Sequence, residues 1–204
     1  MVAVHPDLID RRPRPATGTF VIPVTCLIQC QREDLCNFHG DPKHDSLWRY
    51  ESNPCHADGP FKEGTNYKEE VALAKFLPYL MAGRFWHFPI QLVKKRAPYG
   101  VLLYENPHDP NLGNMFLSVQ RLYTEEKGGT RVRWNLEIDN RVPALLGRQA
   151  FGFPLPIVVA KWSFVALLTL NMRFSLKPMM ESGRFKKIQQ DWDDKVAPGL
   201  KKGE

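Results

Sequence analysis

The chain has 204 residues, of which 43% are hydrophobic and 25% charged. This composition excludes an intrinsically disordered chain, and the lack of a Gly-X-Y repeat or of sustained heptads excludes a fibrous one. Lysine and arginine outnumber aspartate and glutamate by 28 to 22, but the basic residues are scattered along the chain, so we expect no nucleic-acid partner.

The first 19 residues are polar and contain Pro6, Pro13 and Pro15. They lack the apolar segment of a secretory signal peptide, so we expect an intracellular protein, with a mitochondrial or other organellar membrane as a plausible location. The four cysteines are then expected to be reduced thiols. We interpret residues 1–17 as a Pro-rich arm, 18–195 as one domain and 196–204 as a basic tail.

The first regular element is a strand over Phe20–Ile28, where apolar residues alternate along one face. Pro23 cannot donate a ladder hydrogen bond, which predicts an edge strand. A short helix is expected over Gln31–Phe38, followed by a short helical turn that begins at Asp45 or Ser46 and carries Trp48.

The next region is harder to interpret. Residues 51–64 are rich in turn formers, with a possible strand starting at Phe61. Lys68–Lys75 has helical propensity, but Pro78 and Gly83 interrupt the pattern that follows.

The second half has clear strand signals. Phe88–Val93 and Tyr99–Tyr104 predict two strands joined by a turn at Ala97-Pro98. Met115–Thr124 and Thr130–Asp139 predict a hairpin, because the intervening glycines can adopt positive φ.

An apolar stretch follows from Leu155 to Met172 and predicts a long helix over about residues 155–177, with a kink at Pro178 and a continuation through Phe185. At about 18 residues the stretch reaches the lower limit for a membrane span. Lys161, Thr169 and Asn171 favour a buried or membrane-facing helix instead. The face expected to pack inward comprises Val158, Trp162, Val165, Thr169, Met172 and Leu176.

Three segments together resemble the START-like superfamily, which includes polyketide cyclases and lipid-transfer domains. The first is Arg32-Glu-Asp-Leu-Cys-Asn-Phe38 leading to Asp41-Pro42 and a tryptophan, and the second is Glu63–Tyr67. The third and best is Gly128–Asp139, which is similar to the penultimate strand of that superfamily and precedes a long C-terminal helix.

This resemblance implies an α+β helix-grip fold, in which a curved antiparallel sheet wraps around a long C-terminal helix with an apolar cavity between them. The expected ligand is a lipid, quinone or isoprenoid, admitted by opening of Asn106–Gly113 or Arg141–Pro156. We expect no catalytic residues and no cofactor. The residues expected to line the cavity are Trp48, Tyr104, Phe116, Trp134, Trp162 and Met172.

Metal binding is the less favoured interpretation of the cysteines and histidines in residues 26–56. Only Cys26 and Cys30 have zinc-ligand spacing, and on a strand they would lie about 13 Å apart. Cys55-His56 lacks the first cysteine of a haem-attachment motif. Buried free thiols therefore remain the preferred prediction, and no metal is expected.

Two other functions stay open. The chain could be an accessory subunit of an organellar membrane complex, such as a mitochondrial one, with the apolar helix facing lipid or another subunit. It could also be a cyclase-like enzyme, which would need convergent polar residues inside the cavity.

Overall fold

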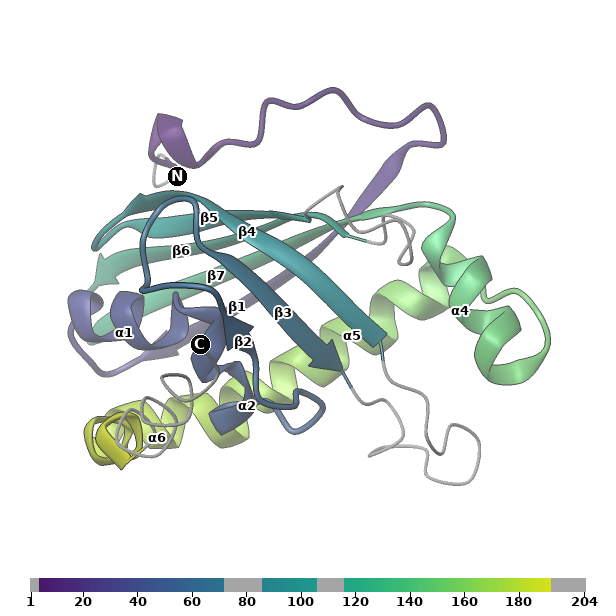
Figure 1. The fold of residues 1–204 in the computed structure, drawn as a ribbon. Coiled ribbons are helices and arrows are strands. Elements are labelled where there is room, and N and C mark those ends of the chain that lie inside the picture. Colours follow the sequence, from purple (N-terminus) through teal and green to yellow (C-terminus); the bar gives the residue numbers. More distant parts are fainter. Residues whose placement is uncertain (1–3, 72–85, 106–115, 192–204) are drawn as a thin grey trace, which may run out of the picture.

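The computed structural model describes residues 4–71, 86–105 and 116–191. A seven-stranded antiparallel sheet, in the order β1-β7-β6-β5-β4-β3-β2, curves around a long C-terminal helical segment (Figure 1). The strands are β1 (Thr19–Ile28), β2 (His56–Ala57), β3 (Asn66–Val71), β4 (Trp86–Arg96), β5 (Gly100–Glu105), β6 (Phe116–Glu126) and β7 (Gly129–Asp139). This is the helix-grip architecture that the sequence predicts.

The helices lie almost entirely on the concave side of the sheet. They are α1 (Arg32–His39), α2 (Asp45–Trp48), α4 (Val142–Phe151), α5 (Ile157–Asn171) and α6 (Lys177–Glu181), with 3-10 turns at Pro6–Leu8 and Pro42–His44. Residues 184–191 are also helical. Both α5 and α6 contact β1, so the C-terminal segment covers the edge of the sheet formed by β1 and β7.

The β1 edge and the β6–β7 hairpin confirm the sequence prediction. Among the described strands β1 pairs with β7 alone. Val24 lies opposite Trp134, so the apolar side chains of both strands point to the same side of the sheet. The hairpin turns at Gly128 and Gly129, whose φ angles are +94° and +144°. A Cβ at Gly129 would lie 2.3 Å from the Ile28 carbonyl oxygen, so only glycine fits this turn.

The structure corrects the predictions for the middle of the chain. The strand expected at Phe61 begins at Asn66, and residues 68–71 are strand rather than helix. Tyr67 and Val71 point into the core while β3 pairs with β4, so tertiary packing overrides the local helical propensity. Residues 72–85 lie outside the described part of the chain.

The segment after Arg141 is also different from the prediction. Val142–Phe151, expected as part of a loop, forms α4 and ends at Gly152, which has a φ of +81°. Asn106–Gly113, the other loop expected to open, lies outside the described residues.

Pro178 distorts the C-terminal helix. It has no N–H to donate and its ring would clash with a carbonyl one turn earlier. The preceding turn, Met172–Leu176, is a π-helix, and the Lys177 N–H bonds to the Met172 carbonyl five residues back. The helix then ends near Gly183 and restarts over 184–191, where Phe185 packs edge-on against Phe38 with ring centroids 5.7 Å apart.

The inward face of this helix agrees with the prediction only in part. Met172 and Leu176 are buried as expected, and Val165 packs against the main core. Its buried apolar residues recur at multiples of four positions and comprise Ala160, Leu168, Met172, Leu176 and Met180, and Asn171 is buried as well. Val158 and Trp162, which were expected to face inward, are instead exposed on the outer side.

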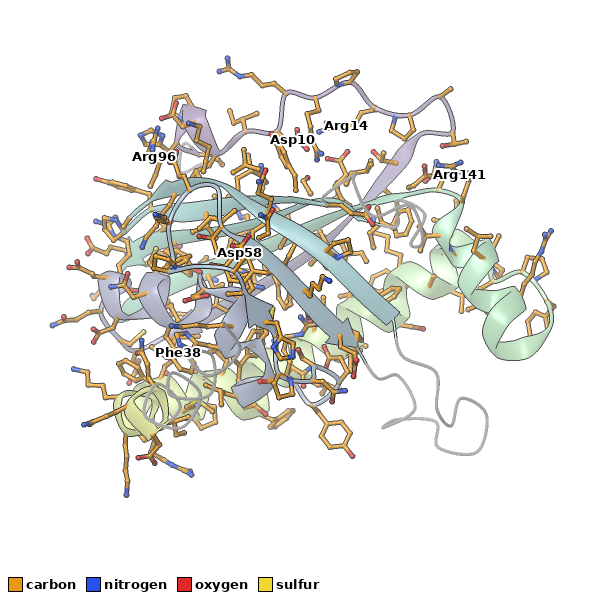
Figure 2. All side chains as sticks on the ribbon, in the orientation of Figure 1. Asp10, Arg14, Phe38, Asp58, Arg96 and Arg141 are labelled. Atoms are coloured by element: carbon orange, nitrogen blue, oxygen red, sulfur yellow. The ribbon has the colours of Figure 1, made fainter. Side chains whose placement is uncertain are left out.

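The N-terminal arm crosses the convex face of the sheet, opposite the C-terminal helix (Figure 1). Leu8 is fully buried against Leu102 and Leu122, and its carbonyl accepts a hydrogen bond from Gln120 Nε2 at 2.7 Å. Asp10 and Arg14 lie on this arm, whereas Phe38 lies on the concave side (Figure 2). The sheet therefore has two covered faces with different contents.

Candidate functional site

Three of the predicted cavity residues meet on the concave face. Trp48 of α2, Trp134 of β7 and Met172 of the π-helical turn all belong to the main core and are at most 3% exposed. The indole rings of Trp48 and Trp134 pack edge to face, with centroids 5.7 Å apart. These residues come from elements far apart in sequence, and the curvature of the sheet brings them together.

Two other predicted residues lie elsewhere. Tyr104 faces the convex side and packs beside Leu8, with the Arg12 guanidinium 3.4 Å from its ring centroid. Its neighbour Leu103 takes the inward position, because side chains alternate along β5. Trp162 is 68% exposed on the outer side of α5. Both are therefore corrections to the predicted set, and the Phe116 side chain lies outside the described part of the structure.

An aromatic group surrounds His39, the last residue of α1. The His39 ring lies 5.1 Å from Trp48, 5.7 Å from Trp134 and 5.7 Å from Tyr123, measured between ring centroids. We call His39, Trp48, Arg121, Tyr123 and Trp134 the inner cluster. Arg121 belongs to it because its guanidinium carbon lies 5.2 Å from the Trp134 ring centroid.

The protonation states of the inner cluster follow from its burial. Burial, reinforced by Arg121 and Arg49, lowers the pKa of His39 well below its usual value, so the imidazole is neutral at neutral pH. Burial also raises the pKa of Tyr123 well above its usual value, so the phenol keeps its proton. His39 Nδ1 and the Tyr123 hydroxyl oxygen are 2.7 Å apart. With the phenol donating to Nδ1, the imidazole carries its proton on Nε2.

Four buried nitrogen groups of the inner cluster have no hydrogen-bond partner among the described residues. They are His39 Nε2, Trp48 Nε1, Arg121 Nε and Trp134 Nε1. The two indole nitrogens and Arg121 Nε are donors, and His39 Nε2 is a fourth donor in the tautomer in which Tyr123 donates to Nδ1. A buried donor without an acceptor costs about 1–3 kcal/mol, so this concentration of unpaired donors calls for an acceptor.

A buried ion-pair cluster adjoins these aromatic rings. Arg121 bonds Asp45 through both Nη atoms, at 2.9 and 2.5 Å. Arg49 bonds Asp45 at 3.1 Å and Glu51 at 2.8 Å, and it also pairs with Glu69. The helix joins this cluster through Asn171 Nδ2, which donates to Glu51 at 2.6 Å.

The ion-pair cluster places three carboxylates around two guanidiniums. Burial raises the pKa of Glu69 despite the opposing effect of Arg49. Burial alone would lower the pKa of Arg49, but Glu69, Glu51 and Asp45 raise it instead. Both arginines therefore stay charged, and burial favours the protonated form of the Glu69 carboxyl.

Sequence reasoning considered His39 only among the possible zinc ligands and Asp45 only as the start of a helical turn. It did not single out Arg49, Arg121 or the other carboxylates around them. The sequence did contain one signal for Arg121. Arg121 lies between Val119 and Tyr123 among the alternate residues of β6 whose side chains point into the core. A charged residue in the apolar phase of a central strand indicates a buried polar partner.

The remaining predictions about this region concern cavities and metals. Two hollows formed by described residues have volumes of about 150 and 450 Å³, and each is bordered on one side by the N-terminal arm. Tyr123 borders the smaller one, and neither Trp48 nor Trp134 lines either of them. Within the described ranges no three His, Cys, Asp or Glu side chains gather closely enough to hold a metal ion. Cys26, Cys36 and Cys55 are buried and all four thiols are free.

Comparison with known proteins supports the fold. No family model and no curated protein matches the chain. The structure resembles the di-domain ARO/CYC StfQ from the steffimycin biosynthetic pathway (TM-score 0.57, 10% identity, 82% of this chain and 53% of that chain). It also resembles the di-domain ARO/CYC BexL from the BE-7585A biosynthetic pathway (TM-score 0.54, 14% identity, 81% and 50%) and the KanY protein (TM-score 0.54, 12% identity, 80% and 99%).

This chain spans about half the length of the two di-domain proteins. Identities of 10–14% establish a shared fold and leave function to be argued from the site. The chain therefore has the START-like helix-grip fold that the sequence resemblance implies.

Proposed function

We propose that this chain binds a hydrophobic ligand with hydrogen-bond acceptor atoms at the inner cluster, beneath the C-terminal helix, and does no chemistry on it. The observation that carries the proposal is the set of four buried nitrogen donors with no partner among the described residues. Carbonyl or ether oxygens of a ligand are hydrogen-bond acceptors, which is the kind of partner that these donors lack.

The chemistry of the inner cluster selects among the ligands expected for this fold. Trp48 and Trp134 offer apolar ring surface together with N–H donors. A quinone presents two carbonyl acceptors on an apolar body, whereas an isoprenoid hydrocarbon presents none. A quinone or another carbonyl-bearing lipid therefore fits the inner cluster better than a pure hydrocarbon does.

The test is a titration with an alkyl-substituted benzoquinone, using the alkylbenzene with the same tail as a probe without acceptors. Trp134→Phe keeps the aromatic ring but removes the N–H, so we expect about tenfold weaker quinone binding, the value of one hydrogen bond. Trp162→Phe is the matched control, because Trp162 is exposed. Native mass spectrometry of the purified protein would identify any co-purified ligand.

The outcomes are distinct. Quinone binding that Trp134→Phe weakens and Trp162→Phe leaves unchanged supports the proposal. Equal binding of the quinone and the alkylbenzene, or quinone binding unchanged by Trp134→Phe, would contradict it. So would a folded protein that binds neither probe, because ordered water would then satisfy the four donors.

A cyclase-like enzyme is the second candidate, favoured by the polar groups that the inner cluster gathers. Neutral His39 can exchange a proton at Nε2, and Glu69 has a raised pKa. Turnover of a poly-β-ketone probe that His39→Gln abolishes, with quinone affinity retained, would favour this enzyme over the ligand-binding proposal. Absence of turnover in the wild-type protein would exclude it for that probe.

A further inference from the structure

The outer side of the C-terminal helix is apolar and exposed. Every fourth residue from Val158 to Phe174 faces away from the sheet, and together they form what we call the outer row: Val158, Trp162, Ala166, Leu170 and Phe174. Trp162 and Phe174 are 68% and 74% exposed. Large exposed aromatic side chains in one line are uncommon on a protein surface that meets only water.

The charges around the outer row are all of one sign. Residues 141–180 contain five lysines and arginines and no aspartate or glutamate. Arg141 pairs with Asp139 and Lys177 with Glu181. Arg148, Lys161 and Arg173 have no ion-pair partner among the described residues. Lys161 directly precedes Trp162 and Arg173 directly precedes Phe174, so these two lysine and arginine side chains add unbalanced positive charge next to the apolar row.

The opposite side of the same helix is held by the protein. Leu168, Met172 and Leu176 belong to the main core, and both α5 and α6 contact β1. The stretch Ile157–Glu181 is long and apolar enough to cross a membrane. Crossing would strip these core residues from the sheet, so the outer row is the side of this helix that the folded protein can offer to lipid.

We infer that the outer row binds an anionic membrane surface, with the helix lying parallel to the membrane plane. Aromatic and aliphatic side chains enter the interface while neighbouring cations meet lipid phosphates and carboxylates, as in interfacial amphipathic helices. A second copy of the chain fits less well, because it would bring the same cations face to face without acidic partners. This inference is independent of ligand binding at the inner cluster.

Vesicle flotation of the full chain tests the inference. We expect binding to phosphatidylcholine vesicles that contain phosphatidylserine, and weaker binding to phosphatidylcholine alone or at high salt. The double variant Trp162→Gln/Phe174→Gln should lose affinity on the order of a hundredfold, because it removes the two largest inserted side chains. Ile9→Gln is the matched control, since Ile9 is 45% exposed on the arm across the sheet.

Orientation is measured by fluorescence quenching. Brominated phosphatidylcholine should quench the wild-type protein, and Trp162→Phe should bind equally well but lose most of that quenching. Trp134→Phe, which tests the inner cluster, should leave vesicle binding unchanged. Failure of ligand binding and failure of membrane binding are thus separate results.

Several outcomes would overturn the inference. They are no flotation of the folded wild-type protein, flotation unaffected by the double variant, and quenching that persists in Trp162→Phe. The protein could also fail to bind vesicles and instead self-associate, or bind an acidic protein, through the outer row. That result would assign this surface to a protein interface.

Discussion

Arg121 of β6 and Asp45 of α2 form a two-bond ion pair across the concave face, at 2.9 and 2.5 Å, and each is at most 1% exposed. The pair connects a central strand of the sheet to the four-residue helix α2, whose buried residues are Asp45 and Trp48. Removing one member would leave the other charge in the core without its main partner, and water cannot replace that partner there.

Arg121→Met should therefore destabilise the protein by about 3–5 kcal/mol, measured by chemical unfolding. Arg131→Met is the control, because Arg131 pairs with Glu126 at the surface and should matter little. The double variant Arg121→Met/Asp45→Leu should recover part of the loss. A single variant as stable as the control would show that Arg49 alone can balance Asp45.

The direction of the side chains was predictable in strands that have one solvent-exposed face. Val132, Trp134 and Leu136 alternate with polar residues in β7, so periodicity indicated their direction. β5 carries apolar residues on both faces, because the N-terminal arm covers the convex side. Alternation therefore could not reveal that Tyr104 faces the arm.

The helix shows the same limit. Its inner row, which includes Leu168 and Met172, and its outer row, which includes Trp162 and Phe174, are both apolar. Hydropathy alone cannot distinguish the side that meets the sheet from the side that meets another surface. The ion-pair cluster escaped prediction because its members are distant in sequence and each is ordinary on its own.

Gly129→Ala should destabilise the hairpin more than Gly128→Ala. Both positions have positive φ, but only Gly129 would place a Cβ against backbone, 2.3 Å from the Ile28 carbonyl oxygen. Gly128 has open space around it. We expect a loss of about 1 kcal/mol at Gly128 from backbone strain and at least twice that at Gly129, measured by thermal unfolding. Equal losses of stability would mean that the β1 backbone at Ile28 shifts easily to make room for the added Cβ.

The four thiols should be unreactive in the folded protein. Burial raises the pKa of Cys36 to about 11 and that of Cys30 to about 12, and it raises the pKa of Cys26 and Cys55 as well. The thiolate, which is the reactive form, is then scarce at pH 8. Titration with a thiol-specific disulfide reagent should detect four thiols only after denaturation. Rapid reaction of one native thiol would contradict this, and single Cys→Ser variants would identify it.

Acidification should destabilise the protein through His39. Because burial beside Arg121 and Arg49 lowers the folded-state pKa well below 6.5, the unfolded chain binds a proton that the folded chain does not. The stabilisation is present above pH 6.5 and is lost as pH falls below it, at up to about 1.4 kcal/mol per pH unit.

His39→Gln removes this titration, whereas Glu69, whose raised pKa acts in the opposite direction, is present in both proteins. The difference in unfolding free energy between wild type and His39→Gln should therefore shrink between pH 6.5 and pH 5. A constant difference over that range would mean that His39 binds its proton as readily in the folded protein as in the unfolded chain, and the neutral imidazole assigned to the inner cluster would be wrong.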